Sequence, residues 1–365
     1  MKQNNQHVDF SLQYNENYRM RHRELSELIE YEDAPYSRIS DVKNNTRMVK
    51  AVLFMNSSKK LSIFNKNVEI DLERTNREIQ TYEEEKDGLH FIEDLSCRVE
   101  VEFKCNIFND FLVTGMVLGF VGAMEGAKFV CTKIIYPGAL SGRMDDVVSE
   151  HRLLIFSNVK FNRNFPNLLT LLDLNRDKYD DVVFIGPIFD RTQDDWDFSK
   201  FNRFLDTFPG KLYILPGLDD PTSGFVPQPP LHKLLFSRNK NVVRLTNPAT
   251  VEINSKTCLF LDGKYAMADL LRYKKHSRAT DAMKAVIKSR LILPNAPDTI
   301  PCVPESHRDP LLLSKVSLIV SGGTKTEYDI FRQKMLLSVA DFDETKVATL
   351  FHMKNKQIEE IAFCE

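Results

Sequence analysis

The stretch of sequence that decides the fold runs from Lys211 to Pro248 and reads KLYILPGLDDPTSGFVPQPPLHKLLFSRNKNVVRLTNP. Its first five residues, KLYIL, are typical of a short buried strand. The strand ends at the turn PGLDD (216–220), where proline and glycine favour a sharp change of direction. Ligands of open α/β sheets bind beyond the carboxyl ends of the strands. The sequence therefore directs attention to this strand end and to others like it.

Composition and charge limit what the chain can be. A length of 365 residues predicts two domains. The net charge of −2, from 49 basic and 51 acidic residues, argues against a protein held mainly by nucleic-acid phosphates. The N-terminus lacks the apolar segment of a signal peptide, and there is no run of about 18 apolar residues. We expect a soluble protein of the cytosol or nucleus.

Six cysteines are spread along the chain without a CxxC pair, which favours buried, reduced thiols over disulfides or a zinc ribbon. They are Cys97, Cys105, Cys131, Cys258, Cys302 and Cys364.

The first half of the chain predicts a helical arm followed by a small barrel. Residues 15–31 have a helical apolar pattern that stops before Pro35, and we expect this arm (1–45) to pack across the second domain. Strand patterns follow at 47–54, 61–64, 95–103, 111–123 and 128–136, with an acidic, exposed segment at 73–88. Five short strands, with glycines 115, 119 and 122 at bulges or corners, predict an OB-fold over 46–137.

The second half predicts an α/β domain over 145–365. Strand patterns at 152–159, 180–189 and 211–217 alternate with helical patterns at 165–177 and 198–208. Further strands are predicted at 242–246, 257–263, 316–328, 334–342 and 348–353, with a basic helix over 268–293. The expected fold class is α+β, an OB-fold barrel followed by an α/β/β/α sandwich.

Four strand ends of this domain match the places where a two-metal phosphoesterase of the calcineurin type carries its ligands. Such a site needs Asp, His and Asn, because divalent ions prefer carboxylate, imidazole and carbonyl donors. At the four ends, Asp-x-His, Gly-Asp-x-x-Asp, Asn-His-Asp and Gly-His-x-His would be required. The chain instead has SNV, GPIFD, GLDD and GGTK. The vestigial phosphoesterase site comprises Ser157, Val159, Gly186, Pro187, Asp190, Gly217, Leu218, Asp219, Asp220, Gly322, Gly323 and Lys325.

The pattern predicts a retained fold with an emptied site. Glycines hold backbone turns and need no chemistry, whereas proline at the bridging position donates nothing to a metal. We interpret Asp190, Asp219 and Asp220 as turn-capping or solvated carboxylates, and His232 and His307 as structural residues. No catalytic residue, metal or cofactor is expected.

Several runs resemble the small (B) subunits of replicative B-family DNA polymerases, and the polymerase delta type most closely. They are PGLDDPTSGFVPQPPLHKLLF, VVRLTNP, NAPDTIPC and DPLLL, with LVTGMVLGFVGAMEGAKFVCTKIIYPG in the barrel. The C-terminal SGGTKTEY and the final IAFCE also fit. The resemblance covers residues 100–365 well and the first 100 residues only by order of elements.

The resemblance implies a noncatalytic scaffold subunit of the DNA polymerase delta complex, which acts in DNA replication in the nucleus. Its partners would be the cysteine-rich, metal-binding C-terminal module of the catalytic subunit and a further small subunit. Contact with DNA would be weak or indirect, and the metal would belong to the partner.

Three alternatives are kept. The chain could be the corresponding subunit of polymerase alpha or epsilon. It could be an unusual metallophosphoesterase that uses Asp190, Asp219, Asp220 and His232. It could also bind single-stranded DNA through the barrel, whose candidate contacts are Phe54, Phe64, Phe103, Phe120, Phe129 and Lys128.

Overall fold

The structure, a computed structural model, divides the chain into two compact units. It describes residues 13, 15–57, 81–82, 89–105, 110–145, 149–190, 202, 205, 208–236, 241–304 and 308–363. The first unit comprises Met1–Leu140, Asp269–Ser277 and Lys284–Ser314, and the second Ser141–Ala268, Arg278–Met283 and Lys315–Glu365. The predicted boundaries at 46–137 and 145–365 differ from these units, because two later segments join the first unit.

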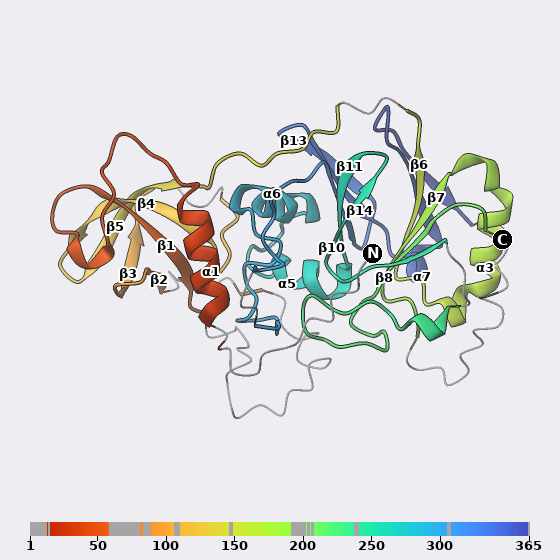
Figure 1. Ribbon diagram of the computed structural model, residues 1–365, viewed down its shortest axis with the longest axis horizontal. Helices are drawn as coiled ribbons and strands as arrows, with labels where there is room; N and C mark the ends of the chain where they lie inside the picture. Colours follow the sequence, from red (N-terminus) through yellow and green to blue (C-terminus); the bar gives the residue numbers. More distant parts are fainter. Residues whose placement is uncertain are drawn as a thin grey trace. The chain divides into compact units, whose positions relative to one another are not determined.

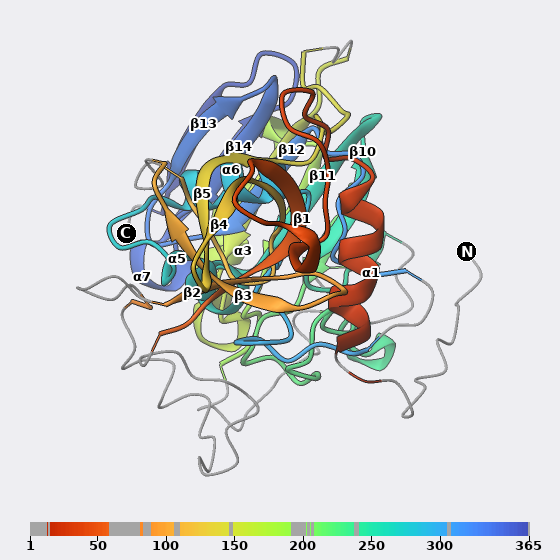
Figure 2. The same cartoon turned by 90° about the vertical axis from the view of Figure 1, so that its left-hand side faces the viewer.

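A closed five-stranded barrel forms the centre of the first unit (Figures 1 and 2). Its strands are β1 (Arg47–Met55), β2 (His90–Glu93), β3 (Arg98–Phe103), β4 (Val117–Glu125) and β5 (Lys128–Ile135), in the order β1-β2-β3-β5-β4. The predicted barrel is thus confirmed. The sequence missed β2, whereas the expected strand at 61–64 and most of the segment 73–88 lie outside the described residues.

A glycine produces the bulge that lets the barrel close. The register between β4 and β5 shifts between Val121 and Gly122. A methyl group at Gly122 would lie 2.0 Å from the carbonyl oxygen of Val130, so only glycine fits there. This is the role that the sequence predicted for glycines in these strands.

The arm helix α1 (Asn15–Ser26) ends five residues earlier than predicted and buries Met20 and Leu25 in the first unit. Figure 2 shows it alongside the barrel. Arg21 is fully buried and pairs with the carboxylate of Asp309. It also donates to the carbonyl of Pro294 at 3.1 Å. Pro294 and Asp309 fall in the second predicted domain, but both belong to the first compact unit.

Two stacked sheets form the second unit. The six-stranded sheet has the order β16-β15-β6-β7-β8-β9, and the five-stranded sheet has the order β10-β11-β12-β14-β13. The first contains β6 (Arg152–Ser157), β7 (Asp181–Ile185), β8 (Leu212–Leu215), β9 (Val242–Arg244), β15 (Val347–His352) and β16 (Ile358–Ala362). The second contains β10 (Ala249–Ile253), β11 (Lys256–Leu261), β12 (Leu318–Gly322), β13 (Glu327–Phe331) and β14 (Lys334–Val339).

The two faces of β6 and β7 enter different cores, because successive side chains of a strand point to opposite faces. Ile155 and Val183 face the five-stranded sheet. Phe156 and Phe184 face the other way, into a cluster that includes Leu168 of helix α3 (Phe161–Leu174). This burial on both sides explains the continuous apolar runs, and the predicted sandwich fold is confirmed.

The remaining helices are short. They are η1 (Ile39–Asp41), η2 (Arg176–Lys178), η3 (Lys233–Leu235), a π-helix η4 (Gly263–Met267), α5 (Ala268–Leu271), α6 (Ala279–Ser289) and α7 (Phe342–Thr345). The single helix predicted over 268–293 is wrong, since α5 and α6 are separated by a turn and 290–293 are not helical. Most of the predicted helix 198–208 lies outside the described residues. No described helix is long and apolar enough to cross a membrane.

Candidate functional site

The strand ends singled out by the sequence meet in pairs in the second unit. A methyl group at Gly186 would lie 2.1 Å from the backbone nitrogen of Gly217, so the ends of β7 and β8 touch. A methyl group at Gly322 would lie 2.3 Å from the hydroxyl oxygen of Ser157, so the end of β12 touches the end of β6. Close approach of backbone therefore accounts for these glycines without any metal chemistry.

Asp220 closes the junction between β7 and β8. Its carboxylate is fully buried and accepts hydrogen bonds from the backbone amides of Gly217 at 2.8 Å, Ile188 at 2.8 Å and Phe189 at 2.9 Å. The two strand-end loops are thus held together by a side chain that serves backbone donors. Its oxygens already accept four contacts from these amides, so little acceptor capacity is left for a metal ion.

Two buried carboxylates of this region have raised pKa values. Burial raises the pKa of Asp220 to about 7, although its three amide donors favour the ionised form. Burial also raises the pKa of Asp262, which caps η4 by accepting the amides of Tyr265 and Ala266, to about 6. The nearby charge of Asp219 adds to both shifts. A bound divalent cation would act in the opposite direction.

Among the described residues, Asp190 and Asp219 do not form with Asp220 a group that could hold a metal ion. Asn162 fixes the loop at Asp190 by donating to its carbonyl at 3.1 Å and accepting its amide at 2.8 Å. Asp219 and Leu218 are half-buried in the turn after β8. Over the described residues, no group of three or more His, Cys, Asp or Glu side chains could hold a metal ion.

The remaining strand-end residues have structural surroundings. Val159 is fully buried in the core beside α3. A methyl group at Gly323 would lie 2.1 Å from the Ser338 hydroxyl oxygen. Lys325 is exposed and pairs with Glu327 at 3.6 Å. His232 accepts the amide of Leu234 and so caps η3, whereas His307 lies outside the described residues.

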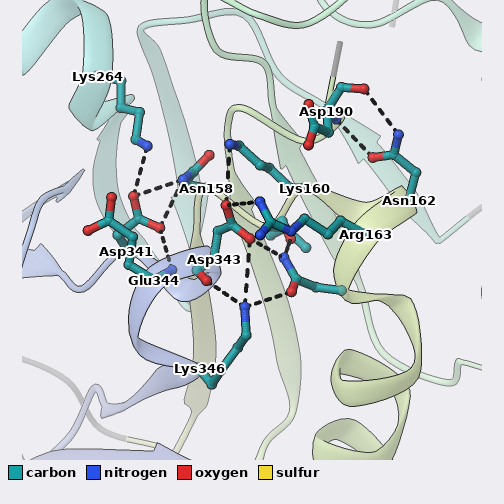
Figure 3. A network of polar contacts seen from close by, with 12 residues as sticks. Asn158, Lys160, Asn162, Arg163, Asp190, Lys264, Asp341, Asp343, Glu344 and Lys346 are labelled. Carbon is teal, nitrogen blue, oxygen red and sulfur yellow. Dashed lines mark hydrogen bonds and ion pairs between the residues drawn. The ribbon is translucent and has the colours of Figure 1, made fainter. Parts of the chain in front are cut away.

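A polar cluster that the sequence reasoning missed occupies the end of β6 (Figure 3). Asp341 accepts two contacts of 2.8 Å from the side-chain amide of Asn158 and one of 2.9 Å from the Lys264 ammonium. It also caps α7 through the amide of Glu344 at 3.2 Å. A fixed lysine therefore supplies positive charge beside the same strand end at which the phosphoesterase pattern calls for a metal.

A second carboxylate stands between three cations close by. Asp343 lies 3.2 Å from Lys160, 3.5 Å from Arg163 and 3.6 Å from Lys346, and it accepts the side-chain amide of Asn164 at 2.8 Å. Burial alone would raise the pKa of Asp343, but the Asn164 hydrogen bond and the Lys160 ammonium outweigh it and the pKa is lowered. Figure 3 shows these side chains directed at one another, so the cluster ties α3 to α7.

Signals for these residues were present in the sequence. Asn158 is the middle residue of the SNV triplet, whose outer two residues alone correspond to metal-ligand positions. The run LFLDGK (259–264) is a further strand end, and it carries both Asp262 and Lys264. Asp341, three residues before Glu344, is the N-cap pattern of a helix. What the sequence could not supply is the pairing of residues 158, 264 and 341 across the fold.

The fold thus combines a closed barrel with a two-sheet sandwich in which the expected metal-ligand positions hold other residues. The family model for the DNA polymerase delta subunit OB-fold domain matches residues 13–134, and the model for the B subunit of DNA polymerases alpha and epsilon matches residues 153–328. The two models together match most of the chain, which therefore belongs to the family of small (B) subunits of replicative DNA polymerases.

Curated relatives carry consistent names. The probable DNA polymerase delta small subunit of Caenorhabditis elegans is 23% identical over 318 residues, with 72% of this chain and 70% of the relative covered. The DNA polymerase delta small subunit of Saccharomyces cerevisiae is 24% identical over 317 residues, with 68% and 65% covered. That of Arabidopsis thaliana is 28% identical over 160 residues, with 41% and 36% covered. The match thus spans less than two thirds of the yeast and plant relatives.

Solved structures match part of this chain at low similarity. An archaeal phosphodiesterase covers 57% of this chain and 98% of its own length, with a TM-score of 0.35 and 11% identity. Vps29 of Chaetomium thermophilum covers 57% of this chain and 95% of its own length, with a TM-score of 0.31 and 11% identity.

Proposed function

We propose that this chain is the noncatalytic scaffold subunit of a DNA polymerase delta complex in the nucleus. It binds the cysteine-rich, metal-binding C-terminal module of the catalytic subunit and links that subunit to a further small subunit. Its contribution to replication is the stability of the assembly, and the chain itself supplies no catalytic group and holds no metal.

The proposal rests on the burial and hydrogen bonding of the Asp220 carboxylate. The metallophosphoesterase alternative needs Asp220 as a ligand, but its carboxylate is fully buried and accepts hydrogen bonds from three backbone amides. Lys264 and Asn158 fill the neighbouring strand end by pairing with Asp341. The polar residues at these strand ends thus bind other groups of the same domain. A domain held in this way offers a rigid surface for other subunits.

The delta assignment rests on two findings. The barrel matches the delta-type OB-fold model, and the curated relatives named above are delta small subunits. The model that matches the sandwich is described for alpha and epsilon subunits, so the corresponding subunit of those polymerases remains the alternative.

Direct binding of DNA by the barrel is not favoured by its aromatic residues. Phe120 and Phe129 are fully buried, and Phe103 contacts Phe120 at a ring distance of 6.4 Å. Lys128 pairs with Glu100 at 2.7 Å. Phe54 is covered by the guanidinium of another barrel residue at 4.8 Å, and Phe64 lies outside the described residues. DNA contact is therefore proposed only as weak or indirect.

The metallophosphoesterase alternative also loses its candidate ligands. The carboxylate of Asp220 accepts hydrogen bonds from backbone amides, and His232 caps η3. Hydrolysis of a phosphodiester with Mn²⁺ that disappears in Asp220→Ala would nevertheless restore this alternative, provided that the variant remains folded.

Co-expression tests the proposal. The full chain is produced with the C-terminal cysteine-rich module of the delta, alpha or epsilon catalytic subunit from the same organism, and each pair is passed over a size-exclusion column. We expect co-elution with the delta module alone, and loss of it when the module's cysteines are replaced by serine. Co-elution with another module would move the chain to that polymerase. No complex with any module would overturn the scaffold assignment.

A further inference from the structure

The edge of the five-stranded sheet at β13 exposes two large apolar side chains. β13 is the last strand of its sheet, and Tyr328 and Ile330 are 59% and 53% exposed. Their register partners on β14, Leu337 and Met335, are fully buried in the core between the sheets. Tyr328 and Ile330 therefore lie on the same face of the sheet as these core residues, but on β13 this face is exposed.

The hairpin geometry shows which backbone groups face this edge. Arg332 and Gln333 have φ angles of 48° and 61°, so a two-residue turn with left-handed residues joins β13 to β14. In such a hairpin the flanking pair, Phe331 and Lys334, exchanges hydrogen bonds, and pairs then alternate along the ladder. The backbone groups of Tyr328 and Ile330 consequently point away from β14.

One of these outward groups already has a local acceptor. The Ile330 amide donates to the Asp329 carboxylate at 2.8 Å, which is a bond that an incoming strand could replace. The other outward groups of Tyr328 and Ile330 face the edge that no described strand covers. An extended segment laid along β13 would gain backbone hydrogen bonds and cover both apolar side chains at the same time.

The charges at the two ends of β13 indicate which kind of extended segment would bind there. Lys325, at the start, is 72% exposed, whereas its partner Glu327 is only 14% exposed. At the turn, Arg332 is exposed. Burial lowers the pKa of Lys334, and the positive charges of Arg332 and Arg143 lower it further. Basic side chains therefore lie at both ends of the strand that exposes Tyr328 and Ile330.

The same charges disfavour a second copy of this chain. Antiparallel pairing of two β13 strands centred on Asp329 would place this carboxylate opposite its own copy. It would also bring Lys325 beside Arg332 of the other copy. Like charges directly opposite one another on paired strands are destabilising. A foreign strand with acidic ends meets neither conflict.

We propose that β13 is a strand-addition site for an extended segment of another protein, with apolar side chains at alternate positions and acidic residues at both ends. The proposal goes beyond the scaffold function and does not depend on which polymerase the chain serves. Tyr328 and Ile330 provide the apolar contacts, and Lys325 and Arg332 set the charge preference.

A peptide-binding experiment tests the proposal. The probe is a fluorescein-labelled peptide in which valine alternates with threonine over the length of β13, with two glutamates at each end. Its affinity is measured by fluorescence anisotropy for the full chain and for Tyr328→Pro. Proline at this position removes an outward amide and spares the ladder to β14. We expect binding to weaken by about tenfold or more.

The opposite edge of the same sheet offers a matched control. β10 is also an edge strand, and a turn with two left-handed residues, Asn254 and Ser255, joins it to β11. The backbone groups of Thr250 therefore point away from β11, as those of Tyr328 point away from β14. However, it exposes Thr250 and Glu252 and no large apolar side chain. Thr250→Pro should leave peptide binding within about twofold of the unaltered chain.

Charge reversal keeps the test informative if Tyr328→Pro fails to fold. The double variant Lys325→Glu, Arg332→Glu should bind the glutamate-ended peptide about tenfold more weakly and prefer a lysine-ended peptide. No binding up to about 1 mM peptide would overturn the proposal. Equal affinity for both peptides, equal loss in Thr250→Pro, or dimerisation of the chain that Tyr328→Pro abolishes would overturn it as well.

Discussion

Replacement of Asp220 by asparagine tests how the emptied strand end is held. The side chain is fully buried, accepts three backbone amides, and has a pKa raised by burial to about 7. A carboxyl group whose pKa is raised binds its proton more tightly in the folded state. Its stabilising contribution is therefore complete below about pH 4, the unfolded value, and is lost as the pH rises through about 7.

The magnitude follows from the same shift. A rise from 3.8 to about 7 corresponds to about 4 kcal/mol at about 1.4 kcal/mol per pKa unit. Asparagine has nearly the same shape and no charge to ionise. We therefore expect the difference in free energy of unfolding, unaltered chain minus Asp220→Asn, to fall by up to about 4 kcal/mol between pH 4 and pH 8.

The assay is urea unfolding followed by circular dichroism at several pH values and constant ionic strength. Asp173→Asn, at an exposed position of α3, is the control and should show a difference near zero throughout. A difference that grows with pH would mean that the three amides outweigh burial and hold the carboxylate ionised. That result would refute the reasoning, and a flat profile would refute it too.

Four further substitutions test other parts of the fold. Gly322→Ala should destabilise by about 2 kcal/mol or more in urea unfolding, because its methyl group would lie 2.3 Å from a hydroxyl oxygen. Gly224→Ala, whose nearest neighbour would be at 3.8 Å, should change stability by less than about 0.5 kcal/mol. Arg21→Met strands a buried carboxylate and should cost about 3–5 kcal/mol; a neutral result in chemical denaturation would contradict this. The His151 ring donates a hydrogen bond to the Asp181 carboxylate, which raises the pKa of His151. His151→Gln should therefore lose stability relative to the unaltered chain below about pH 6.5, and lose less as the pH rises through the folded pKa. Unfolding midpoints whose difference is independent of pH would count against this reasoning.

The order of elements could be predicted from local patterns. Apolar runs such as those of β6 and β7 are readable because both faces of these strands are buried, which removes polar residues from them. The glycine at position 122 is likewise readable as a bulge, since a strand rarely tolerates glycine without one. The fold class and the noncatalytic family followed from this level of evidence.

Element boundaries were predicted less well, for a physical reason. The helical pattern over 268–293 continues across a break because the separate helices α5 and α6 both bury apolar side chains. Strand β2 was missed because HFIE is short and only Ile92 of its four residues is buried. Local periodicity does not report where tertiary contacts interrupt an element.

For the candidate site, the sequence by itself determined which ligands are missing, because a proline or leucine at a ligand position cannot coordinate an ion. Only the tertiary structure decided what replaces them. The pairing of Asp341 with Asn158 and Lys264 joins residues that are 77 to 183 positions apart, and the three amides on Asp220 come from two different strand ends. Contacts over such separations depend on how the sheets stack, which the residue pattern of one strand does not encode.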